Sequence, residues 1–123
     1  MLFSENVIYI QIEHDCFNFL HVQSNKSTKI YGKFSNGRLA IAHFKVAEKA
    51  LKEGVYEVYP KSFFRSNPTV VIHQIYNSEG GLCEIEDRIL REAALGAGAR
   101  QVFVWQGTPL TFTQLQSKEY ARK

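Results

Sequence analysis

The chain has 123 residues, of which 45% are hydrophobic and 22% charged, and its formal net charge is +3. These values match one globular domain over residues 1–123 and exclude a disordered chain. No apolar run approaches the roughly 18 residues of a membrane helix, and the first residues lack the basic flank and apolar core of a signal peptide. We therefore expect a cytoplasmic protein.

The first third of the chain predicts an antiparallel meander. Residues 7–12 are apolar and rich in β-formers, which suits a strand buried on both faces. Residues 16–22 and 27–34 are two further β-like stretches, and the polar turn-forming residues 23–26 separate them. Three short consecutive strands favour hairpin connections.

Helices and strands alternate through the rest of the chain. Apolar residues between Ile41 and Val55 recur at helical spacing, whereas a proline-containing loop leads from there to an apolar strand. A second amphipathic helix is stopped by Gly96. The predicted elements are helix 43–53, strand 69–75, helix 82–95 and strand 101–105.

The second predicted helix has an apolar face that we expect in the core and a charged face that we expect in solvent. The apolar face consists of Leu82, Ile85, Ile89 and Ala93. The expected ion pairs on the charged face are Glu84 with Arg88 and Asp87 with Arg91.

The C-terminal segment allows two interpretations. Thr108-Pro109 or Thr111 starts a last short helix that ends in basic residues by Lys123. Residues 110–113 instead alternate in polarity, as a strand would.

The order β-β-β-α-β-α-β, followed by this short helix, defines the fold class. A meander followed by β-α-β crossovers is α/β, with a five-stranded mixed sheet whose first, fourth and fifth strands are parallel and buried. This is the layout of a ribonuclease-H-like half domain.

About half of the chain carries a family resemblance. The stretches 37–51, 62–72 and 84–104 have an order and spacing typical of one family, and the run Arg-Glu-Ala-Ala-Leu-Gly-Ala-Gly-Ala-Arg at 91–100 is the most specific part. They resemble MreB, the bacterial actin homologue of rod-shaped cells.

A second resemblance rests on shorter segments, namely residues 9–12, 34–36, 46–49, 79–82 and 88–90. These are similar to YjaA-type proteins, small stress-associated proteins of enterobacteria. Both resemblances imply an actin-type subdomain.

The MreB resemblance implies where a nucleotide would bind. Actin-type ATPases hold it between two such domains, with an Asp-x-Gly-Thr phosphate loop after the first strand. The corresponding turn here, residues 12–17, has no glycine, and Glu13 and Asp15 would repel phosphate. Glu86 corresponds to the carboxylate that positions the attacking water in that family. Asp15 and Glu86 thus mark a vestigial nucleotide cleft, and we expect neither cofactor nor catalysis.

One stretch of the chain carries charge of a single sign. No acidic residue lies between Asp15 and Glu48, whereas several bases do. They could meet an acidic protein surface or phosphate, or guard an edge strand against aggregation. The candidate interaction surface consists of Lys26, Lys29, Lys33 and Arg38.

Other chemistry has weaker support. The four histidines are scattered and predict no metal site. Two cysteines cannot form a disulfide framework, although Cys83 lies near a helix start, where the dipole favours thiolate. Residues 77–81 form either a recognition loop or a plain connection to the helix.

The sequence therefore predicts a non-catalytic protein-interaction module of MreB-related fold, associated with stress or cell shape. It acts as a monomer or homodimer with an unidentified protein partner. The alternatives are half of a residual ATPase cleft and a nucleic-acid binder that uses its basic edge.

Overall fold

The computed structural model describes residues 5–60 and 66–122. The start of the chain, part of the proline-containing loop with residues 62–65 of the second MreB-like stretch, and Lys123 lie outside the described residues. The strands are β1 (Val7–Glu13), β2 (Cys16–His21), β3 (Lys26–Tyr31), β4 (Thr69–Gln74) and β5 (Gln101–Trp105). The helices are α1 (Phe44–Val58), α2 (Glu84–Gly96) and α3 (Phe112–Gln116), followed by a 3₁₀ turn, η1 (Glu119–Ala121).

The five strands form one mixed sheet in the order β3-β2-β1-β4-β5. The meander β1-β2-β3 is antiparallel, whereas β1, β4 and β5 are parallel. This arrangement confirms the predicted α/β class and matches an actin-like half domain. β1 lies at the centre because its continuous apolar run can be buried on both sides.

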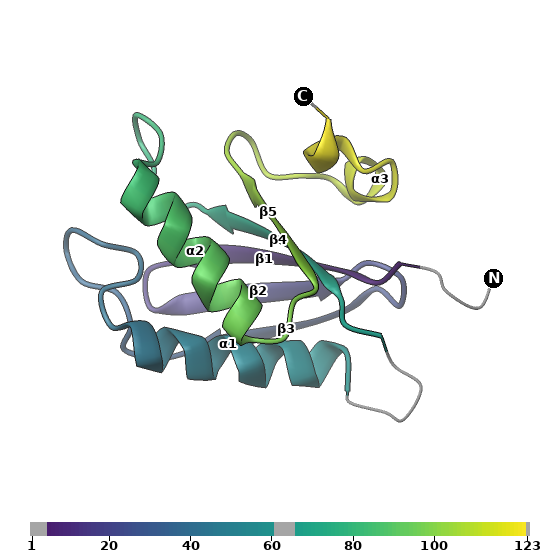
Figure 1. Cartoon of the computed structure of the whole chain (residues 1–123), viewed down its shortest axis with the longest axis horizontal. Helices are drawn as coiled ribbons and strands as arrows, with labels where there is room; N and C mark the ends of the chain where they lie inside the picture. Colours follow the sequence, from purple (N-terminus) through teal and green to yellow (C-terminus); the bar gives the residue numbers. More distant parts are fainter. Residues whose placement is uncertain (1–4, 61–65, 123) are drawn as a thin grey trace.

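Different segments of the chain pack on the two faces of the sheet. Helices α1 and α2 lie on one face (Figure 1) and pack on the side chains of Ile8, Ile10 and Ile12. The C-terminal segment covers part of the other face, where Leu110, Leu115 and Tyr120 enclose the alternate residues of β1 and β4. The period of two in each strand therefore separates two cores.

The prediction that the fifth strand is buried is wrong. β5 lies at an edge of the sheet and pairs with β4 alone among the described strands. Its residues are half-buried from Val102 to Trp105, and Gln101 is exposed. An apolar sequence is compatible with such an edge because α2 and the C-terminal segment each contact one of its faces.

The predicted third strand, 27–34, ends early at Tyr31. The chain turns at Gly32, and Phe34 inserts its ring into the core, stacked on Phe17 with ring centroids 4.0 Å apart. Burial of this ring and the contacts of the β1–β2 turn, described below, redirect the backbone.

Helix α2 is oriented differently from the prediction. Leu90, Ala93 and Ala94 are its buried residues, whereas Ile85 is 73% exposed. The predicted pair of Asp87 and Arg91 forms, with Nε 2.7 Å from Oδ1. Glu84, however, does not pair with Arg88, which contacts Glu92 one turn later.

The C-terminal segment contains a helix rather than a strand. Thr111 caps α3 because its side chain accepts a hydrogen bond from the backbone N–H of Gln114, whose own side chain accepts from Thr111 N–H. Lys118, with φ of 58°, separates α3 from η1.

Candidate functional site

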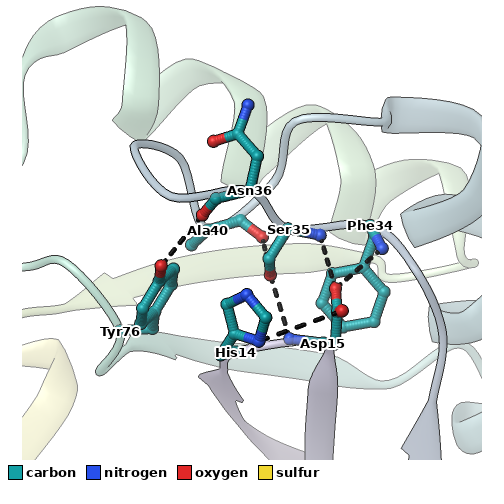
Figure 2. A network of polar contacts seen from close by, with 7 residues as sticks. All are labelled: His14, Asp15, Phe34, Ser35, Asn36, Ala40 and Tyr76. Atoms are coloured by element: carbon teal, nitrogen blue, oxygen red, sulfur yellow. Dashed lines mark hydrogen bonds and ion pairs between the residues drawn. The ribbon is translucent and has the colours of Figure 1, made fainter.

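The turn after β1, where an actin-type protein would place its phosphate loop, is tied to the segment that follows β3 (Figure 2). Asp15 Oδ1 accepts hydrogen bonds from the backbone N–H groups of Phe34, at 3.1 Å, and Ser35, at 2.8 Å. Ser35 Oγ accepts from Asp15 N–H and donates to Ala40 O. The Asp15 carboxylate therefore serves as the hydrogen-bond acceptor of two backbone N–H groups, as a helix-capping carboxylate does.

A second set of contacts lies beside this turn. The ring of His14 meets that of Tyr76 edge to face, with centroids 4.9 Å apart, and the Tyr76 hydroxyl donates to Asn36 O (Figure 2). The carboxyl ends of β1 and β4 are thus joined to the loop of residues 32–43.

Glu86, the other residue of the predicted cleft, is half-buried at the start of α2. Its Oε1 accepts a hydrogen bond from Cys83 N–H at 3.0 Å, so it caps its own helix. No hydrogen bond or ion pair joins it to Asp15 within residues 5–60 and 66–122. The vestigial nucleotide cleft stays a prediction, and both carboxylates already have backbone partners.

An apolar groove of about 250 Å³ lies between α2 and the loop of residues 32–43. The exposed side chain of Ile85 forms part of its wall, together with Glu86 and Gln74. The remaining lining includes Leu39, Ile41, Phe44 and Ile89.

Only part of the predicted basic surface lies on an edge strand of the sheet. Lys26 and Lys29 belong to β3, whereas Lys33 and Arg38 follow it in the next loop. All four side chains are exposed. None of them takes part in an ion pair in the part of the chain that the structure describes.

Lys29 also lines a shallow groove on the open half of the sheet face. This groove measures about 570 Å³, and Pro109 and Leu110 of the C-terminal segment bound it. Its floor consists of alternate residues of three strands, among them Gln11, Asn18 and Ser27. Among the described residues that line it, Lys29 alone is charged.

A buried hydrogen-bond chain attaches the C-terminal segment to the sheet. His73 Nε2 lies 3.0 Å from Gly107 O and Nδ1 lies 2.8 Å from the Tyr9 hydroxyl, which accepts from Leu110 N–H. A carbonyl only accepts, so Nε2 carries the proton and Nδ1 accepts from Tyr9. Burial lowers the pKa of His73. The neutral ring is therefore the form that this chain of bonds requires.

We expect the protein to lose stability on mild acidification. Burial also lowers the pKa of His21, so folded His21 and His73 bind fewer protons than the unfolded chain between pH 6.5 and their lowered pKa values. Stability is complete above that window and falls as the pH drops through it. The hydrogen bond with Lys118 lowers the pKa of Glu5, so the stability that Glu5 contributes is lost only below pH 4.5.

Thermal unfolding at about pH 7.5 and about pH 5 measures this effect. Relative to the native chain, His73→Gln should shrink the difference in Tm between the two conditions, whereas His43→Gln, at an exposed position, should leave it unchanged. Equal Tm values of the native chain at both pH values would contradict the prediction.

Among the described residues, no three His, Cys, Asp or Glu side chains gather in a way that could hold a metal ion. Both cysteines are free thiols. Burial raises the pKa of the Cys16 thiol. Cys83 is exposed and is the N-cap of α2, so it lies at a helix start, where the sequence predicted it.

Sequence reasoning missed two glutamines at the carboxyl ends of neighbouring parallel strands. Gln74 ends β4, and Gln106 directly follows β5. A polar residue at the end of each of two apolar strands was the available signal, because ligands of α/β sheets bind at these ends.

No helix in the described ranges is long and apolar enough to cross a membrane. No protein-family model matches the sequence. The chain is 36% identical to the uncharacterized protein YjaA of Escherichia coli (strain K12), and the match covers 75% of this chain and 76% of YjaA. The chain belongs to the YjaA family.

The other similarity is partial. The chain is 41% identical to the cell shape-determining protein MreB of Escherichia coli (strain K12) and 36% identical to that of Haemophilus influenzae. Each match covers 52% of this chain and only 17% of MreB. This member of the YjaA family thus spans about a sixth of the length of the MreB proteins that it matches. The similarity within the matched part supports the actin-like fold.

Proposed function

We propose that this protein is a non-catalytic interaction module of actin-like fold, which binds an extended acidic segment of a partner protein along the edge strand β3. The single observation that carries the proposal is an exposed strand edge whose basic side chains take part in no ion pair within the described residues. The match to MreB covers 52% of this chain, and Asp15, at the expected phosphate-loop position, accepts hydrogen bonds from the backbone of Phe34 and Ser35, which supports a role without catalysis.

The edge has the geometry for strand addition. β3 pairs only with β2 among the described strands, so its outer row of backbone groups faces solvent. Contacts to α1 hold it in place, since Ile30 is buried and Thr28 Oγ1 donates to Glu57. A partner strand would gain main-chain hydrogen bonds from such a fixed edge.

The side chains of this edge specify the partner's charge. Lys29 and Tyr31, which is 72% exposed, point to the face opposite α1. An acidic residue at the matching position of the added strand would meet Lys29 directly, and Lys26 and Lys33 extend the positive field along the edge. An acidic strand therefore fits better than a basic or neutral one.

We expect a synthetic peptide of alternating Glu and Val to bind and a Lys–Val peptide not to bind. Lys29→Glu should weaken binding at least about tenfold, because it replaces attraction by repulsion at the centre of the edge. Lys29→Gln and Gln116→Glu lower the net charge equally. Lys29 lies on the β3 edge and Gln116 does not, so only Lys29→Gln should weaken binding. Hydrogen exchange of the β3 amides locates the site.

The two alternatives predict other results. A single-stranded oligonucleotide that binds more tightly than the Glu–Val peptide, with strong salt dependence, would favour the nucleic-acid binder. Equal peptide binding by Lys29→Gln and the native chain would contradict binding of the partner along β3.

The partner in the cell belongs, in this proposal, to the cell-shape machinery, as the name of MreB suggests. Crosslinking in cells, with the native chain and Lys29→Glu as parallel baits, tests this assignment. Capture of MreB by the native bait alone supports it, whereas capture of the chain itself alone contradicts it. An association with stress and the cytoplasmic location stay predictions.

A further inference from the structure

Two glutamine side chains form the walls of a small cavity at the carboxyl ends of β4 and β5. The cavity measures about 310 Å³, and Gln74 and Gln106 line it together with Ser78, Gly81 and Gly107. None of these residues is charged. The carboxyl ends of parallel strands are where α/β sheets bind ligands, and a cavity without charge suits a neutral one.

The amide of Gln74 has a fixed orientation. Its Nε2 donates to Tyr76 O at 3.0 Å and to Asn77 O at 3.3 Å, and two carbonyl oxygens can only be met by an amino group. Oε1 therefore remains as a free acceptor. Gln74 is only 4% exposed, and no residue of the described chain donates to this oxygen.

This oxygen nevertheless borders open space. Among the described residues, the Tyr120 hydroxyl is the only fully enclosed side-chain polar atom without a partner. Gln74 Oε1 is thus accessible although its residue is buried, and the Gln74 side chain lines this cavity as well as the apolar groove beside α2. A buried acceptor that opens into a cavity is a group that a ligand can satisfy.

Gln106 provides a hydrogen-bond donor rather than an acceptor. Its Oε1 accepts a hydrogen bond from Leu82 N–H at 3.0 Å, which leaves its Nε2 without a partner among the described residues. Gly81 lies beside this contact, and its φ of +89° favours glycine. The loop before α2 therefore fixes the amide of Gln106, which lines the same cavity as Gln74.

We propose that this cavity binds a neutral small molecule through a cis-amide edge, in which an N–H donor and a C=O acceptor lie side by side. Gln74 Oε1 accepts from the ligand N–H, and Gln106 Nε2 donates to the ligand carbonyl. The ring lactam of a nucleobase and a primary carboxamide both have this edge. A trans peptide bond does not, because its N–H and C=O point in opposite directions. This site is separate from the β3 edge.

Titration of ¹⁵N-labelled protein with uridine and with nicotinamide tests the proposal and distinguishes the two ligand sources. The side-chain amide signals of Gln74 and Gln106 should shift with at least one probe. The matched probes 3-methyluridine and N,N-dimethylnicotinamide lack the donor and should bind at least about tenfold more weakly, because they leave Gln74 Oε1 unpaired.

Gln106→Glu is the matched variant, because it keeps an acceptor for Leu82 N–H and replaces the donor by an oxygen. It should reduce binding at least about tenfold, whereas the same exchange at exposed Gln116 should not. Absence of shifts with both probes, equal binding of methylated and parent probes, or native binding by Gln106→Glu would each overturn the proposal. The methylated probes test it on the native protein even if the variant fails to fold.

Discussion

Gly54→Ala is expected to lower the Tm by about 8 °C, which corresponds to a loss of about 2 kcal/mol in the free energy of unfolding. Gly54 lies in α1 where the helix crosses β2, and a Cβ there would lie 2.1 Å from the ring of Phe19. That ring is buried, so the helix must lift. Overpacking costs about 3 kcal/mol, and the better helix propensity of alanine returns about 1 kcal/mol.

Gly37→Ala is the matched control. Apart from the adjoining residues, no heavy atom of the described chain lies within 4 Å of the added Cβ at this position, so we expect a change of less than about 0.5 kcal/mol. The double variant Gly54→Ala/Phe19→Leu should be less destabilised than the sum of its two single variants, because the smaller side chain relieves the clash. Strict additivity of the two effects in thermal unfolding would contradict the close approach of α1 to β2.

The sequence predicts the order of the elements well because that signal is local. The continuous apolar run of β1 identifies a strand buried on both faces, and helical spacing identifies the inward residues of α1, such as Ala47 and Leu51. Ile85 shows the limit of this reasoning. Its spacing places it on an apolar stripe, but the tertiary contact rotates α2 toward Leu90 and Ala94 and leaves Ile85 on the wall of a groove.

Site residues are harder to predict because their partners are distant in the chain. The sequence identifies Asp15 as a carboxylate at a turn, but its acceptor role depends on backbone groups 19 and 20 residues away. The free atoms of Gln74 and Gln106 depend on which carbonyl or N–H each amide meets first, which no sequence pattern records. The sequence thus identifies candidate residues, and their roles follow from the groups that they contact in the folded structure.

Asp15→Ala should cost about 3 kcal/mol in unfolding free energy. The substitution leaves the N–H groups of Phe34 and Ser35 without their charged acceptor and puts alanine at a φ of 54°. Asp15→Asn retains an acceptor oxygen and a residue type that tolerates this φ, so we expect it to cost about 1 kcal/mol or less. Urea unfolding of both variants measures the difference.

The same pair of variants separates the structural role of Asp15 from the residual nucleotide cleft. If Asp15 faced a phosphate, removing its negative charge in Asp15→Asn would raise the affinity for Mg-ATP, because like-charge repulsion would be lost. If its carboxylate serves the loop after β3, Asp15→Asn will bind no more ATP than the native chain. Tighter ATP binding by Asp15→Asn together with unchanged stability of Asp15→Ala would favour the nucleotide cleft, since a capping carboxylate cannot be removed without loss of stability.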